Sequence, residues 1–541
     1  MRPLRTFSLL RREPLLGQRI PYTAHVSEHV VRTRAGHYVQ VLQLSGASFE
    51  CADPTELNAW HERWNVLYRS IASPNLAIWT HLIRHREHSY PGGEFANPFA
   101  AALNERYRAR IAGQRLMRND LYRSLVYRPT SGAQPGSPRE CLRLRDPRLI
   151  DGEPHRVPLP RAPLDRVLGT TRPSFGLETL EFRSATHTRL GAMLGIKEYA
   201  TPTAPGILNS LLSAPFPLVL SQSFAFLKKA TSQSLLTRQY NQLTNAGDFA
   251  RSQAEKLKDA LDALTSGEWV MGDHHLSLLV LADPVEEATA RSDTWRMKAL
   301  NDRVAMARDL LADAHLVIAR EDLALEETFW GQLPGAFTHR PRKAPITSRN
   351  FSGFSPYHNY ATGRPDGNHW GEATTVFISS AGSAYHYAPH ASDPDDPDGG
   401  TRKDIGHTLI VGPTGSGKTV VIGFLIAMLT RQNVTQIVLD KDRGLQICVL
   451  ALGGEYLALR NGHPTGFNPL QLEPTPANFQ FLKSWLRALA QPPGLPVLTV
   501  REHADLDQAL HGTLALERSH RRLSRLVEFQ PSGSFWGLGA R

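Results

Sequence analysis

The chain has 541 residues, which is enough for about three domains, and 41% of them are hydrophobic, which allows sizeable cores. Its formal net charge is +10 at pH 7, but the basic residues form no dense run. We therefore attribute the charge to solvated surfaces; direct contact with nucleic acid is possible in principle but is not indicated. The cysteines Cys51, Cys141 and Cys448 are far apart and form no CxxC pair, which excludes a disulfide framework and favours a reducing compartment.

Residues 1–130 predict a mixed region of strands and helices. The stretch 37–46 ends in a turn signal and predicts a strand. The stretch 53–71 has a proline near its start and Leu and Trp residues at helical spacing, so it predicts a helix. The stretch 77–88 predicts a second strand.

Two groups of histidines in predicted strands could suggest a metal site. In the first group, His88 would point to the opposite face from His81 and His85, and no carboxylate pattern accompanies them. In the second, the adjacent His274 and His275 would point to opposite sheet faces, so they cannot chelate one ion together. We assign no metal site to either group.

Two segments rich in proline, glycine and charge predict connections between domains. Residues 131–174 form a linker, and residues 391–404 form a polar loop. The four aspartates of the polar loop could suggest calcium. Prolines interrupt them and no glutamate completes an EF-hand register, so a solvated loop is favoured.

Residues 175–390 predict an α/β domain. Helical periodicity runs through 234–264 and again through about 285–313. The stretches 268–283 and 315–319 predict strands. Later in the domain, a pair of strands resembling a hairpin is predicted within 373–390.

The longest uncharged stretch of the chain, residues 199–227, has the length of a membrane span. It contains four prolines and many Ser, Thr and Gln residues, which favour buried strand and loop over a membrane helix. The N-terminus carries arginines, but its apolar core is too short for a secretory signal. The sequence therefore predicts that any contact with a membrane is peripheral.

The stretch "GPTGSGKT" has the G-x-x-x-x-G-K-[ST] spacing of a phosphate-binding loop. A predicted strand (407–411) precedes it, and a predicted helix (420–432) and a second strand (435–440) follow, as the motif requires. Glycines allow a sharp turn with inward N–H groups, the lysine places a cation near the β- and γ-phosphates, and the threonine hydroxyl can ligate magnesium. The sequence therefore predicts that ATP and magnesium bind at Gly412, Pro413, Thr414, Gly415, Ser416, Gly417, Lys418 and Thr419.

The catalytic acid is harder to find. Asp440 ends the second predicted strand, but only about one helix separates it from the loop, whereas the acidic Walker B strand usually comes later in the chain. Asp440 is therefore a weak candidate. No apolar run followed by Asp-Glu occurs after residue 445, so the catalytic residues stay unknown. The chain becomes helical from about residue 476.

Several motifs, in order along nearly the whole chain, resemble the VirB/TrbE/CagE-type ATPases of type IV secretion and conjugative transfer machines, with the TrbE-like branch closest. They are "NDLYRSLVYRP" (119–129), "SAPFPLVLSQSFAFL" (213–227), "FWGQLPGAF" (329–337), "APITSRNFSGF" (344–354), "DGNHWG" (366–371), the phosphate loop, "DKDRG" (440–444), "ALGGEY" (451–456) and "PTGFNPLQ" (464–471).

The resemblance implies an α/β protein with an N-terminal docking region (1–130), a CagE/TrbE/VirB-type domain (175–390) and a RecA-like P-loop NTPase domain (405–541). It implies an ATP hydrolase in which Lys418 and Thr419 hold the Walker A positions. It also implies a cytoplasmic homo-oligomer, peripheral to the inner membrane, that works with other proteins of the machine. Family members continue further, through a Walker B Asp-Glu, so we expect this ATPase domain to be incomplete and the chain to be C-terminally truncated.

Two alternatives remain. A non-hydrolysing docking or assembly module would keep the N-terminal contacts and at most bind nucleotide. A DNA-translocating coupling ATPase is disfavoured, because coupling proteins carry N-terminal transmembrane helices and the sequence predicts none here.

Overall fold

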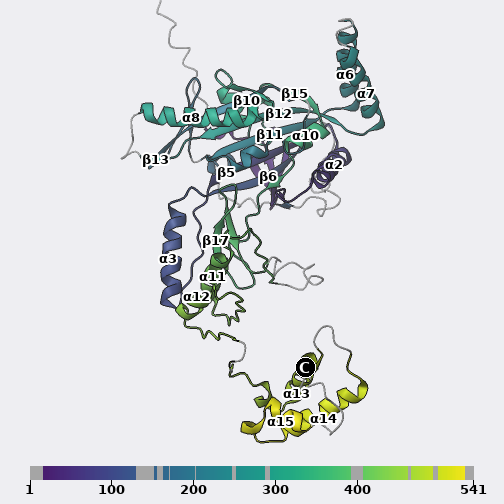
Figure 1. Cartoon of the computed structure of the whole chain (residues 1–541). Helices are drawn as coiled ribbons and strands as arrows, with labels where there is room; N and C mark the ends of the chain where they lie inside the picture. The colour runs from purple at the N-terminus through teal and green to yellow at the C-terminus, as the bar shows by residue number, and fades with distance from the viewer. Residues whose placement is uncertain are drawn as a thin grey trace, which may run out of the picture. The chain divides into compact units, whose positions relative to one another are not determined.

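The computed structural model (Figure 1) describes residues 16–129, 152–154, 163–169, 171–200, 203–245, 251–286, 293–390, 406–460, 463, 465–491 and 497–529. The predicted polar loop 391–404 and most of the predicted linker lie outside these residues. The backbone packs as two units, the first ending at Lys441 and the second beginning at Asp442.

A large antiparallel sheet forms the first unit. Among the described residues it has fourteen strands, ten of which follow one another in space. In spatial order these are β1 (Tyr22–Ser27), β2 (Val30–Thr33), β3 (Tyr38–Leu44), β6 (Met117–Tyr127), β5 (Leu76–Arg86), β11 (Leu218–Phe226), β12 (Met271–Leu281), β10 (His187–Glu198), β9 (Leu180–Arg183) and β8 (Pro173–Phe175). The strands β7 (Gly152–Pro154), β13 (Val285–Glu286), β14 (Val317–Arg320) and β15 (Ala344–Thr347) pair at its margins.

The central strands are brought together from distant parts of the sequence. Leu220 of β11 lies opposite Leu82 of β5 on one side and Leu278 of β12 on the other. Side chains alternate between the two faces of a strand, so this register places all three leucines on one face. All three are buried in the main core.

Three helices cover that face: α2 (Pro54–Ile71), α8 (Asp293–Ala312) and α10 (Ser348–Phe354). Their apolar residues join the main core, where the ring of Phe351 stacks on Phe224 of β11. The start of α2 follows from its sequence, because the Asp53 side chain accepts a hydrogen bond from the Glu56 amide and a proline occupies the first turn.

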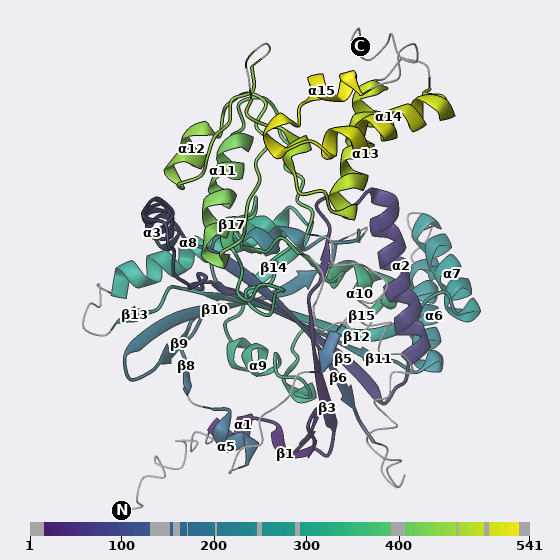
Figure 2. The ribbon, with the colours of Figure 1, turned by 90° about the horizontal axis from the view of Figure 1, so that it is seen from below.

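The opposite face carries a smaller core under α9 (Leu325–Trp330), where Leu325 packs with Met193 and Leu279. Figure 2 shows α8 and α9 on opposite sides of β10. Because helices cover both faces, the central strands are buried on both sides, unlike a sheet with one wet face, and they carry buried polar side chains such as Gln222 and His274 beside the apolar ones.

Most of the predicted elements of the sheet domain are confirmed. The strands and helix predicted at 37–46, 53–71, 77–88, 268–283 and 315–319 correspond to β3, α2, β5, β12 and β14, and the hairpin within 373–390 is β17 (Thr375–Ile378) with β18 (Ala384–Tyr387). The uncharged stretch 199–227 forms a 3-10 helix (η2, Asn209–Ser213) and β11, as expected of buried strand and loop. Over the described residues, every helix is too short or too polar to cross a bilayer.

Two helix predictions need correction. The periodicity over 234–264 belongs to two helices, α6 (Lys229–Asn245) and α7 (Arg251–Ser266), which pack against each other and project from the sheet in Figure 1. The helix predicted from residue 285 begins only at Asp293, because residues 285–286 form β13 and pair with β10. In both cases the apolar spacing is right and the boundary is wrong.

The remaining elements of the first unit are short or peripheral. They are α1 (Leu16–Arg19), β4 (Ala47–Ser48), α3 (Pro98–Ala112), α5 (Leu164–Val167), η5 (Phe337–His339), β16 (His358–Asn359), α11 (Lys418–Leu429) and η7 (Thr430–Gln432). The second unit is helical, as predicted from residue 476, and a cluster of leucines forms its core. It contains α12 (Gln446–Ala451), η8 (Pro469–Gln471), α13 (Pro476–Ala490), α14 (Val500–Leu514), η9 (Arg518–His520) and α15 (Leu523–Glu528).

Candidate functional site

The predicted phosphate loop turns sharply into α11. Gly415 has φ +82° and Gly417 has φ +89°, the left-handed region that favours glycine. A Cβ on Gly412 would lie 2.6 Å from the Ser416 Oγ, which would have to rotate away. Lys418 and Thr419 form the first turn of α11. Gly415 and Gly417 therefore have the sharp-turn conformation that the sequence predicts.

Lys418 folds back over the loop. Its Nζ donates hydrogen bonds to the carbonyl oxygens of Gly412 (2.8 Å) and Pro413 (2.9 Å). The ammonium group therefore lies over the concave side of the turn, where the helix N-terminus adds partial positive charge. The loop residues Thr414, Ser416 and Thr419 are exposed. The loop is therefore accessible from solvent.

The segments on either side of the loop and its helix differ from the prediction. Neither 407–411 nor 435–440 forms a strand. Their alternate apolar side chains are strongly exposed: Leu409 86%, Val411 81%, Ile437 88% and Leu439 96%. A parallel strand gains hydrogen bonds only beside another strand, and among the described residues neither segment has such a neighbour. The predicted strands are therefore wrong as hydrogen-bonded elements, although both segments have the apolar pattern of strands.

Asp440 ends the second of these segments and is half-buried. The side chain of Gln436, in the same segment, donates a hydrogen bond to the carbonyl oxygen of Ile426 on α11 (2.9 Å). The segment thus runs alongside the phosphate-loop helix. A catalytic role for Asp440 stays a prediction.

The far end of α11 is held by a residue that the sequence analysis did not single out. Arg431, directly after the helix, donates hydrogen bonds to four backbone carbonyl oxygens of the sheet domain. No local pattern marks this arginine. The only sequence signal nearby is the Pro91-Gly92-Gly93 turn, which supplies two of the carbonyls but does not reveal its partner.

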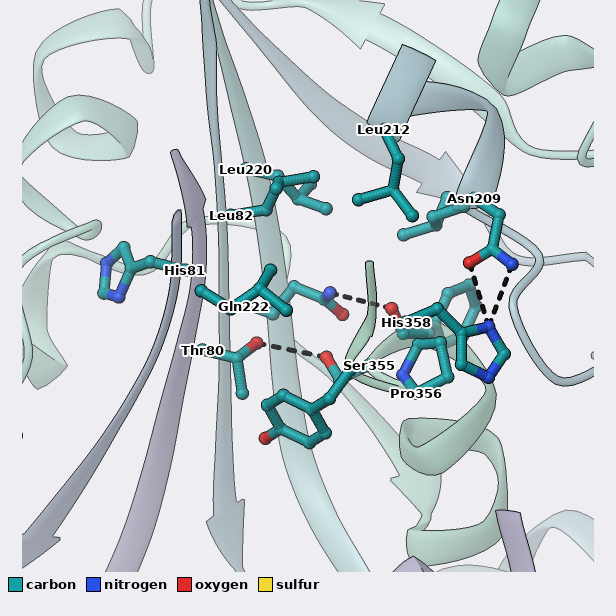
Figure 3. Close-up of a pocket in the computed structure, with 14 residues that line it drawn as sticks. Thr80, His81, Leu82, Asn209, Leu212, Leu220, Gln222, Ser355, Pro356 and His358 are labelled. Carbon is teal, nitrogen blue, oxygen red and sulfur yellow. Dashed lines mark hydrogen bonds between the residues drawn. The ribbon is translucent and has the colours of Figure 1, made fainter. Parts of the chain in front are cut away.

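A separate small pocket of about 50 Å³, with a mostly apolar lining, lies in the sheet domain (Figure 3). The hydroxyls of Thr80 and Ser355 are hydrogen-bonded across it (3.0 Å), and the amide of Asn209 contacts His358 Nδ1 (2.9 Å). Burial, together with the nearby His61, lowers the pKa of His358 to about 4, so this imidazole is neutral at pH 7. A space of this size holds one or two water molecules and cannot admit a nucleotide.

Three of the five histidines for which a metal site was considered have other partners. His81 Nε2 lies 2.8 Å from the carbonyl oxygen of Gln332, and His85 Nε2 lies 2.7 Å from a carboxylate oxygen of Asp120. His274 bridges the hydroxyl of Tyr199 and the side-chain oxygen of Gln222. These contacts stabilise the sheet domain.

Two family models match the chain. Residues 29–134 match the N-terminal domain of the type IV secretion system ATPase VirB4/TrbE, and residues 147–342 match the CagE, TrbE, VirB family, a component of the type IV transporter system. The type IV secretion system protein virB4 of Bartonella quintana is 36% identical over 99% of this chain and 72% of its own length. This chain belongs to the CagE/TrbE/VirB family.

Other relatives agree with this membership. The virB4 protein of Brucella suis is 33% identical over 97% of this chain and 69% of its own length. The type IV secretion system protein PtlC homolog of Bordetella bronchiseptica is 34% identical over 96% of this chain and 69% of its own length. These relatives carry the names virB4 and PtlC, and a closer tie to the TrbE-like branch stays a prediction.

Proposed function

We propose that this chain is the ATP-binding subunit that energises a type IV secretion or conjugative transfer machine, and that it binds ATP with magnesium at Gly412–Thr419. Family membership supports the machine. The observation that carries the site is the loop itself, in which positive-φ glycines lead into a helix N-terminus and a lysine lies over the turn. Hydrolysis by this chain rests on its resemblance to the family.

The residues of the loop would have different roles in binding ATP and magnesium. Lys418 would exchange the carbonyl oxygens of Gly412 and Pro413 for the β- and γ-phosphate oxygens, and so would keep two hydrogen bonds while gaining charge attraction. The amides at the start of α11 would bind phosphate oxygens. The Thr419 hydroxyl would hold magnesium, which supplies positive charge against the phosphates.

A titration of the full chain with labelled ATP and magnesium tests this site. Lys418→Ala removes the only side-chain cation of the motif, a charge-assisted contact that contributes roughly 1.5–3 kcal/mol. We expect affinity to fall more than about tenfold. Lys441→Ala is the matched control, because Lys441 is exposed and lies outside the loop. Equal affinities for wild type and Lys418→Ala would refute the assignment.

The second candidate, a docking or assembly module that binds nucleotide without hydrolysing it, is favoured by the segments 407–411 and 435–440, which form no strand. In-line hydrolysis needs an oriented water and positive charge on the developing oxygens, and a sheet that lacks strands places neither. We infer that both segments need strand partners that the described residues do not supply, and that nucleotide binding at the loop is therefore separable from turnover.

Steady-state ATPase assays separate the two candidates. We expect the 541-residue chain to turn over ATP no faster than Lys418→Ala. Adding the part of the Bartonella quintana virB4 protein that this chain does not span, fused or as a separate polypeptide, should restore activity if the chain is one part of a motor. Robust turnover by the chain alone, abolished by Lys418→Ala, would contradict the inference and make Asp440 the first residue to mutate.

We further propose that the protein acts as a homo-oligomer on the cytoplasmic face of the inner membrane, beside other proteins of the machine. The family description supports these partners. If membrane association is peripheral, high salt or carbonate should release the chain from membranes, and resistance to both would argue against it.

A further inference from the structure

The end of α11 that lies away from the phosphate loop is fixed to two distant segments through one side chain. The Arg431 Nη2 donates to the carbonyl oxygens of Ala373 (2.6 Å) and Thr374 (2.7 Å). The Nη1 donates to the carbonyl oxygens of Pro91 (3.3 Å) and Gly92. One guanidinium therefore joins the loop after β5 to the start of the β17–β18 hairpin.

The surroundings of Arg431 are shaped to hold it. Gly93 has φ +107°, and a Cβ there would lie 2.5 Å from the Arg431 Cδ, so any other residue would push the side chain away. The Phe95 ring centroid lies 5.7 Å from the guanidinium carbon. The carboxylate of Glu372 accepts a hydrogen bond from the Gly92 amide (2.6 Å), which fixes the loop that supplies two of the carbonyls.

A second contact joins the middle of α11 to the same part of the sheet domain. The centroid of the Phe424 ring lies 4.5 Å from the centroid of the Tyr107 ring on α3 and 6.0 Å from that of the Phe377 ring on β17. The Tyr107 hydroxyl donates to the Val376 carbonyl oxygen (2.8 Å). Figure 1 shows α3 alongside α11 and β17. A movement of α11 must therefore disturb α3 and the hairpin.

The near end of α11 is where phosphate would bind. Lys418 is the first of the 12 residues of α11, and Arg431 lies two residues beyond the last of them, so the length of the helix separates the two functions. That is a rigid rod of about 18 Å. Phosphate would draw Lys418 away from the carbonyls of Gly412 and Pro413, so the bound and free states differ in contacts at this end.

We propose that Arg431 is a positioning residue that couples nucleotide occupancy of the phosphate loop to α3 and the β17–β18 hairpin. This coupling rests on the proposed nucleotide binding at Gly412–Thr419. The four carbonyls converge on a planar fork, and a lysine ammonium cannot reach both pairs with the same geometry. The coupling therefore depends on arginine and not on positive charge alone.

Hydrogen exchange of the full chain, with and without magnesium and ADP, tests the coupling. In wild type we expect nucleotide to change amide exchange within residues 90–112 and 373–387. Arg431→Ala should abolish this change while the affinity for nucleotide stays within about threefold of wild type. Arg431→Lys should retain only part of the change. Arg106→Ala, at an exposed position on α3, is the matched control and should behave as wild type.

Each outcome separates the coupling from the proposed function. Nucleotide binding by wild type without any exchange change in the two segments would overturn the coupling and leave the binding site intact. An unaltered response in Arg431→Ala or Arg431→Lys would also overturn the role of Arg431. If wild type binds no nucleotide, the proposed function fails and the coupling fails with it. Circular dichroism shows whether Arg431→Ala is folded. If it is not, the hydrogen-exchange response of Arg431→Lys tests the coupling.

Discussion

The antiparallel sheet and the segments around the phosphate loop are built from similar apolar stretches, yet only the sheet forms strands. In β12, Leu278 is fully buried between neighbouring strands and helices. In the segment 435–440, Leu439 has the same side chain and is almost wholly exposed. The apolar pattern is therefore necessary for a buried strand, but the neighbours decide whether the strand forms.

The two regions obtain neighbours in different ways. An antiparallel strand can pair with a strand a short turn away, as β1 does with β2 in the large sheet. A parallel strand can pair with the next strand only after a long crossover connection has returned the chain to the same end of the sheet. The conformation of the phosphate loop is nevertheless encoded locally, because it needs only its glycines and the start of α11. The loop can therefore form although the segments on either side of it form no strands.

The largest difference between the sheet and the segments around the phosphate loop should appear in how far a substitution lowers the free energy of unfolding. Phe351→Ala removes a fully buried ring that stacks on Phe224, with 4.7 Å between ring centroids. We expect the free energy of unfolding of the sheet domain to fall by roughly 3–5 kcal/mol, because the substitution leaves a cavity. Urea unfolding followed by tryptophan fluorescence measures it. A loss under about 1 kcal/mol would show that this core is not the stabilising element.

A smaller effect should appear with pH. Burial, with His275 and Arg340 nearby, lowers the pKa of His274 to about 3. An unfolded histidine binds a proton near pH 6.5 and the folded one does not, so stability is full above pH 6.5 and is lost as the pH falls toward 3.

The substitution His274→Gln removes one such group. The stability of the variant should depend less steeply on pH between 6 and 4, by up to about 1.4 kcal/mol per pH unit. Urea midpoints for wild type and variant at three pH values within this window measure the difference. Parallel curves would show that His274 titrates normally.

The smallest effect is expected outside the sheet. Leu439→Ala should change the free energy of unfolding by less than about 0.5 kcal/mol, because this side chain already meets water. The same urea experiment compares it with Phe351→Ala. A large destabilisation by Leu439→Ala would mean that the segment is buried in solution, and the contrast between the two regions would fail.

Sequence reasoning located most of the sheet domain because its signals are local. Asp53 and the proline after it mark the start of α2, and the spacing of the glycines with Lys418 and Thr419 marks the phosphate loop. The same reasoning misplaced the start of α8, because a short pairing with β10 takes residues 285–286. Local pattern predicts the type of an element better than its ends.

What could not be predicted depends on distant partners. The strands expected at 407–411 and 435–440 need neighbours that no local pattern can supply. Arg431 looks like an ordinary surface arginine until folding brings Pro91, 340 positions away, against it. Four backbone carbonyls carry no residue identity, so nothing in the sequence marks them as its acceptors.

The pairing of β5 with β11 also determines how long β5 stays without this partner during synthesis. Leu82 and Leu220 are register partners 138 positions apart. At about 5–20 residues per second, β5 waits roughly 7–28 s for β11 to leave the ribosome. During that wait its open edge can pair with other nascent chains. We expect ribosome-bound chains stopped before residue 218 to recruit chaperones, and chains that extend well past residue 281, once β11 and β12 have emerged, to recruit far less.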